Sequence, residues 1–139
     1  MAELHVFAGK TNWRQPLRIG IRLEGGRFIR LCGHRGDSVI ADSEPLQTSD
    51  FGEGGSIEVG DISESLPSGL LEADISKIRF IEGGFGQRIG LALLSREETF
   101  CFWIDDDEFR WGSWEDLCSA ELAVGICPKL GSAFEDEEP

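Results

Sequence analysis

The segment RIGLALLSREETFCFWI, residues 88–104, contains two stretches of alternating hydrophobic residues around a polar turn. Apolar side chains recur at 89, 91 and 93 in the first stretch and at 100, 102 and 104 in the second. A period of two places such side chains on one face of a β-strand. The polar residues 95–98 predict the turn between the strands. We therefore expect an antiparallel hairpin with one face in a hydrophobic core.

Further strands are expected on either side of this hairpin. A strand at 78–81 leads into it through a glycine-rich turn at 82–87, and an acidic turn at 105–108 leads to a strand at 109–111. Nearer the N-terminus, alternating or apolar stretches at 17–23, 27–32 and 38–42 predict a three-stranded meander. Both meanders share an outline of Ile-Arg, apolar residues and Glu-Gly-Gly. This outline fits a degenerate internal repeat, and it fits chance similarity between glycine-rich hairpins.

The remaining segments complete the fold prediction. Residues 43–71 are rich in Gly, Ser and acidic residues and predict an irregular connection with a short strand at 57–59. Ser113-Trp114-Glu115-Asp116 matches a capping box, which predicts a helix from Trp114 to about Leu122. The chain is therefore expected to be mainly β: an antiparallel curved sheet or sandwich from two β-meanders with one short C-terminal helix. Residues 1–134 form one domain, and the charged tail at 135–139 is expected to be disordered.

Charge is unevenly distributed along the 139 residues, which carry a formal net charge of -13. Residues 1–36 hold seven basic and two acidic residues, whereas residues 37–139 hold six basic and 24 acidic residues. An acidic domain is repelled by the dense negative charge of nucleic acid, and it attracts basic proteins. We expect a protein partner and no nucleic-acid partner. The simpler interpretation is that the charge maintains solubility.

Localisation and redox state follow from what the sequence lacks. No apolar run approaches the roughly 18 residues that cross a bilayer, and the first ten residues show no signal-peptide pattern. We expect a cytoplasmic protein without a membrane partner. The four cysteines, Cys32, Cys101, Cys118 and Cys127, form no C-x-x-C pair. In the cytoplasm they are expected to be reduced and mostly buried.

Motifs that carry chemistry are incomplete. Gly9-Lys10-Thr11 lacks the first glycine of a phosphate-binding loop. Gly83-Gly84-Phe85-Gly86 leads into an alternating strand, so a hairpin turn is favoured over an anion site. Asp105–Glu108 lacks the spacing of a calcium loop, and Cys32-Gly33-His34 lacks a second pair at zinc spacing. The sequence therefore predicts no enzyme activity, no metal and no cofactor.

The segment from Trp103 to Trp114 is the predicted binding surface. Trp103 falls on the strand face opposite Phe100 and Phe102, and an acidic turn follows it. Aromatic residues dominate the energetics of interfaces, and acidic neighbours attract a basic partner. The alternative is that these Trp residues close the ends of the sandwich. The predicted partner-binding residues are Trp103, Asp105, Asp106, Asp107, Glu108 and Trp111.

The size, the acidity, the Trp- and Asp-rich segment and the meander with Glu82-Gly83-Gly84 resemble the immunity proteins of bacterial toxin–immunity systems. This resemblance is one of general character and transfers no residue roles. It implies a cytosolic inhibitor that covers the active site of a cognate toxin, often a nuclease. Two alternatives remain: a small-molecule-binding or accessory domain, suggested by Gly83–Gly86 and residues 43–71, and an acidic nucleic-acid mimic. The sequence does not indicate whether the protein is a monomer or an oligomer.

Overall fold

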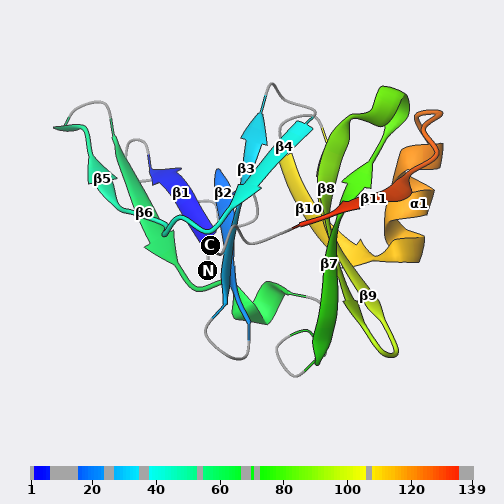
Figure 1. Ribbon diagram of the computed structural model, residues 1–139. Helices are drawn as coiled ribbons and strands as arrows, with labels where there is room; N and C mark the ends of the chain where they lie inside the picture. Colours follow the sequence, from blue (N-terminus) through cyan, green and yellow to red (C-terminus); the bar gives the residue numbers. More distant parts are fainter. Residues whose placement is uncertain are drawn as a thin grey trace.

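The computed structural model describes residues 2–6, 16–23, 27–34, 38–52, 55–66, 70, 73–105 and 108–134. They form two antiparallel sheets and one short α-helix (Figure 1), which confirms the mainly β prediction. The first sheet has the order β4-β3-β2-β1-β6-β5, with β1 Ala2–Val6, β2 Arg18–Arg22, β3 Phe28–His34, β4 Ser38–Asp42, β5 Ser49–Asp50 and β6 Ser56–Gly60. The second has the order β10-β9-β8-β7-β11, with β7 Ile75–Glu82, β8 Arg88–Ser95, β9 Thr99–Asp105, β10 Glu108–Ser113 and β11 Lys129–Ala133.

Both predicted meanders are present. The strands β2, β3 and β4 are consecutive neighbours in the first sheet, as β7, β8, β9 and β10 are in the second. In the β8–β9 hairpin, Leu91 lies directly opposite Phe102. The glycine-rich turn between β7 and β8 contains a 3-10 turn, η4, at Gly84–Gly86. Residues 57–59 lie within β6, as expected. The sequence did not predict the strands β5 and β11.

The two sheets pack face to face around the main core. The first sheet contributes Ile19, Ile21, Ile29, Leu31 and Val39, and the second contributes the alternating residues Ile78, Phe80, Leu91, Leu93, Phe100, Phe102, Ile104 and Phe109. β4 packs against β8 and β9 where the sheets approach (Figure 1). Phe100, Phe102 and Ile104 lie in this core, as their period of two predicted. Of the two expected arrangements, a curved sheet or a sandwich, the structure has the sandwich.

A second core on the outer face of the second sheet corrects the expectation for Trp103. The helix α1, Trp114–Leu122, covers this face (Figure 1) and inserts the fully buried Leu117 against Cys101 and Trp103. Trp103 is only 3% exposed. Alternation correctly placed its side chain opposite Phe102, but it carries no information about what covers that face. The middles of β8 and β9 are therefore buried on both faces of the sheet.

The start of α1 has the predicted capping box. The Ser113 hydroxyl accepts a hydrogen bond from the Asp116 amide at 3.1 Å, and the Asp116 carboxylate accepts one from the Ser113 amide at 3.0 Å. Gly125, with a φ of 80°, lies in the turn that follows the helix. The left-handed φ favours glycine at this position. Because the N-cap residue Ser113 is also the last residue of β10, the helix begins where the strand ends.

Several predicted features lie outside the described residues. They are Gly9-Lys10-Thr11, the acidic tail 135–139, and the Glu24-Gly25-Gly26 half of the proposed internal repeat. The repeat therefore remains a prediction. Within the described part of the chain, no helix combines the length and the apolarity needed to cross a bilayer.

Candidate functional site

A groove of about 700 Å³ lies at one end of the second sheet. It forms where the β8–β9 turn, the end of β10 and the first turn of α1 meet. We call it the acidic groove, and it is lined by Glu97, Glu98, Thr99, Phe100, Trp111, Gly112, Ser113, Trp114, Glu115 and Asp116. It combines two tryptophans with four carboxylates.

The strand register explains why these residues meet. Phe100 at the start of β9 lies opposite Ser113 at the end of β10. The β8–β9 turn, closed by a 2.9 Å hydrogen bond from the Ser95 amide to the Glu98 carbonyl, therefore lies beside the start of α1. Glu97 and Glu98 reach the groove from the turn, and Glu115 and Asp116 reach it from the helix.

The two tryptophans of the acidic groove, Trp111 and Trp114, each pack against a hydrophobic core. The Trp111 ring lies 6.4 Å from the Phe102 ring, centroid to centroid, and packs against the main core. The Trp114 side chain packs against the helix-covered core. Both rings are partly exposed and line the groove. Rigid, amphipathic aromatic groups held in this way lose little conformational entropy on binding.

The electrostatics of the acidic groove favour a cation. Its lining contains no Lys, Arg or His. Within the described part of the chain, no basic side chain forms an ion pair with Glu97, Glu98 or Glu115, whereas the Asp116 carboxylate accepts the capping hydrogen bond. Carboxylates that share a groove repel one another, and a bound cation relieves this repulsion. The aromatic faces add attraction for a cationic group.

The acidic turn lies at the other end of the β9–β10 hairpin. Asp105 pairs with Glu108 in the register, five residues from the Phe100–Ser113 pair, which is about 17 Å along a strand. Arg110 forms ion pairs of 3.4 Å with both Asp105 and Glu108, so one cation partly offsets the charge of the two described acids.

The six predicted partner-binding residues therefore do not form one surface. Trp103 is buried under α1, and Trp111 lines the acidic groove. Asp105 and Glu108 lie at the far end of the hairpin, and Asp106 and Asp107 lie outside the described residues. Four groove residues were not predicted from the sequence: Glu97, Glu98, Glu115 and Asp116. Two signals could have found them: the capping box that starts a helix directly after the last strand, and the turn at the same end of the sheet.

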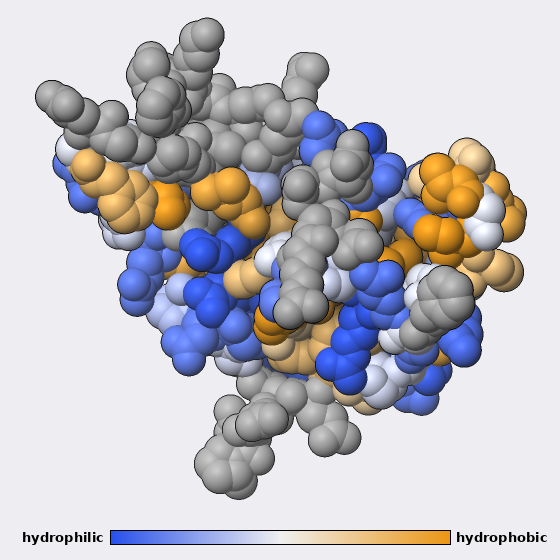
Figure 2. All heavy atoms as spheres, turned by 90° about the horizontal axis from the view of Figure 1, so that it is seen from above, coloured by the Kyte–Doolittle hydropathy of each residue, from blue (hydrophilic) through white to orange (hydrophobic). Residues whose placement is uncertain are grey.

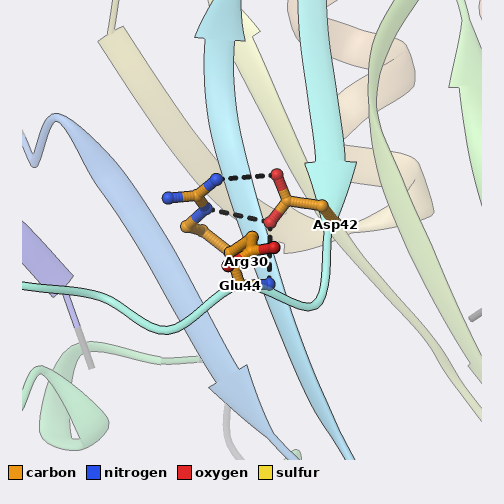
Figure 3. Close-up of polar contacts among 3 residues, drawn as sticks. All are labelled: Arg30, Asp42 and Glu44. Carbon is orange, nitrogen blue, oxygen red and sulfur yellow. Dashed lines mark hydrogen bonds and ion pairs between the residues drawn. The ribbon is translucent and has the colours of Figure 1, made fainter.

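A bidentate ion pair on the outer face of the first sheet holds one of the basic residues of the N-terminal segment (Figure 3). Arg30 and Asp42 lie opposite each other on β3 and β4. The Arg30 side chain donates hydrogen bonds of 2.9 and 2.8 Å to the Asp42 carboxylate, which also accepts the Glu44 amide at 3.0 Å. Burial alone would raise the pKa of Asp42, but these hydrogen bonds outweigh it and lower the pKa. The pair joins β3 to β4 and is structural.

The four cysteines are free thiols. Cys101 is buried, Cys32 and Cys118 are half-buried, and Cys127 is exposed. Burial raises the pKa of Cys101 to about 12 and also raises the pKa of Cys32. These two thiols are therefore protonated at neutral pH and are poor nucleophiles. Among the described residues, no group of three or more His, Cys, Asp and Glu is placed to bind a metal ion.

Hydrophobic residues gather at the margin of the molecule that carries α1 (Figure 2). Leu122 at the end of the helix and Val124 in the following turn are 60% and 64% exposed.

The chain matches no family model, no curated protein and no solved structure. The chemistry of the acidic groove is therefore the basis for inferring function.

Proposed function

We propose that this protein is a binding protein of the immunity type, which inhibits a basic toxin or enzyme by inserting the rim of the acidic groove into its active site. The observation that supports the proposal is the convergence of Trp111 and Trp114 with four carboxylates and no basic side chain. An inhibitor of this kind would act in the cytoplasm and would need no catalytic group of its own.

Arginine and lysine side chains of the partner fit the chemistry of the groove. A guanidinium group binds a carboxylate through two parallel hydrogen bonds and stacks on an indole face. Nucleases and other nucleotide-directed enzymes bind phosphates with such residues. The net charge of -13 adds long-range attraction that speeds the encounter with a basic cleft.

Capture of the partner and a test of inhibition address this proposal. The tagged protein and its Glu98→Lys/Glu115→Lys variant are each used to capture proteins from the native lysate. We expect the wild type alone to retain a basic protein in a salt-sensitive manner. The captured protein should lose its activity when mixed with one equivalent of the wild type, and it should keep its activity with the variant. Full activity in the presence of wild type would contradict the proposal.

A small organic cation is the second candidate ligand of the acidic groove. The volume of about 700 Å³ falls within the range of small-molecule sites. In that case the protein would capture no basic partner, and a screen of amines and quaternary ammonium compounds would raise its melting temperature. The Glu98→Lys/Glu115→Lys variant should abolish this stabilisation.

A further inference from the structure

A second groove, of about 400 Å³, lies near the same end of the second sheet but carries the opposite charge. It forms where the start of β7, the end of β11 and the residue before β3 meet. We call it the basic groove, and it is lined by Arg27, Ser76, Lys77, Ile78, Arg79, Ala133 and Phe134. Three of these seven side chains are cationic and none is acidic, in a chain with twice as many acidic as basic residues.

Phe134 provides the rigid wall of the basic groove. Its amide donates a 2.8 Å hydrogen bond to the Ile78 carbonyl, and its ring packs edge-on against Phe80 with the centroids 6.1 Å apart. The Arg27 guanidinium lies over the Phe134 ring, 5.9 Å from its centroid. A cation–π contact of this kind holds the guanidinium in place without neutralising its charge.

The three cations keep their charge available for a ligand. Within the described part of the chain, no carboxylate forms an ion pair with Arg27, Lys77 or Arg79. Arg79 donates a 2.8 Å hydrogen bond from Nε to the Gly131 carbonyl, which fixes the side chain and leaves its other N–H donors. A further cation, Arg88, lies over the neighbouring Phe80 ring at 3.9 Å. Like charges gathered in this way favour binding of a multiply charged anion.

The neighbouring acidic groove limits the size of that anion. Lys77 pairs with Leu94, and Leu94 pairs with Thr99 of the acidic groove. The backbones of Lys77 in the basic groove and Thr99 in the acidic groove are thus two strand spacings apart, roughly 10 Å, which is comparable to the Debye length in physiological salt. A nucleic-acid strand would carry its phosphates past Glu97 and Glu98 and would be repelled. A compact oxyanion avoids this repulsion.

We propose that the basic groove binds the diphosphate group of a small molecule through Arg27, Lys77 and Arg79. Two guanidinium groups present planar pairs of donors that match phosphate oxygens, and the lysine adds a point charge. The site is independent of the proposed inhibitor function, because it uses different residues.

Calorimetric titration of the full chain with sodium pyrophosphate at constant ionic strength tests this site. We expect saturable binding at one site, weaker binding of orthophosphate, and a loss of affinity of about tenfold or more in the Arg27→Gln/Lys77→Gln variant. The matched control, Arg96→Gln/Lys129→Gln, removes the same charge from exposed positions outside the groove and should bind pyrophosphate like the wild type. Arg79 is left unchanged because its bond to Gly131 supports the fold.

Three outcomes would overturn the proposal. They are an absence of saturable binding by the folded wild type, equal weakening in the groove variant and the control, and tighter binding of a penta-glutamate peptide than of pyrophosphate. The peptide arm distinguishes a carboxylate ligand from a phosphate ligand. Circular dichroism of each variant verifies that it is folded.

Discussion

The acidic groove and the basic groove share one end of one sheet, yet their charges are opposite. The acidic groove takes its carboxylates from a turn and from the first turn of a helix, whereas the basic groove takes its cations mainly from the start of a strand. The backbone register brings each set together, and the side chains at those positions decide the sign of the charge. The net charge of -13 is therefore a poor description of the local charge in either groove.

Removal of the support behind the acidic groove should have the largest effect. Leu117 is fully buried between α1 and the second sheet, so Leu117→Ala should lower the free energy of unfolding by about 2–5 kcal/mol. Urea denaturation measures this loss. Leu122→Ala, at a position that is 60% exposed, is the control and should change stability little. If Leu117→Ala lowered the free energy of unfolding only slightly, the packing of α1 on the second sheet would not stabilise this side of the groove.

Charge reversal should separate the two grooves. Glu98→Lys/Glu115→Lys should weaken binding of a hexa-arginine peptide about 10- to 100-fold at low salt and less at physiological salt, because screening shortens the Debye length from about 30 to about 8 Å. Tryptophan fluorescence reports the titration. The control, Glu58→Lys/Glu64→Lys, reverses two exposed charges elsewhere. Equal weakening in both variants would show that only net charge matters.

Loss of the helix cap should have a smaller effect. Ser113→Ala removes the hydroxyl that accepts the Asp116 amide and should lower stability by about 1 kcal/mol. The first turn of α1 would fray, so the peptide affinity of the acidic groove should fall while the pyrophosphate affinity of the basic groove stays constant. Ser119→Ala, exposed in the middle of the helix, should change neither affinity. Thermal unfolding and the two titrations test this pattern.

The smallest effect is expected at Glu121, on the helix that forms one side of the acidic groove. Glu121 is 5% exposed. Burial, together with the charge of Asp105, raises its pKa. The folded state therefore favours the neutral carboxyl group. The stability associated with this group is fully present below the pKa of the unfolded state, about 4.3, and is lost as the pH rises through the pKa of the folded state. Glu121→Gln should be more stable than wild type at neutral pH and equal to it near pH ~4. Denaturant midpoints across this pH range, with the exposed Glu64→Gln as control, test the sign.

The sequence predicted local structure well. The period of two identified the strands of both meanders, and the capping box at Ser113–Asp116 identified the start of the helix. These features depend on neighbours within a few residues. Burial of Trp103 depends on where α1 packs, and the ion pairs of Arg110 depend on the geometry of the hairpin. Such long-range information is absent from the pattern of a single strand.

The candidate site was only partly predictable for the same reason. Trp111 was identified because aromatic residues near acids are typical of binding surfaces. The acids that line its groove were not, because Glu97 and Glu115 are far apart in sequence and meet only through the Phe100–Ser113 register. The basic groove joins Arg27, Lys77 and Phe134, which no short motif connects.

The position of β1 within the first sheet has a consequence for how the chain folds. β1 pairs with β2 on one side and with β6 on the other, where Ala2 lies opposite Gly60. The N-terminal strand therefore completes its pairing only after the chain as far as β6 is available. Pairings of such long sequence separation slow folding, because a large loop must close first. Among the described strands, β5 and β6 join the rest of the sheet only through β1, so local opening of β1 would release this edge as a unit and expose its amides to hydrogen exchange.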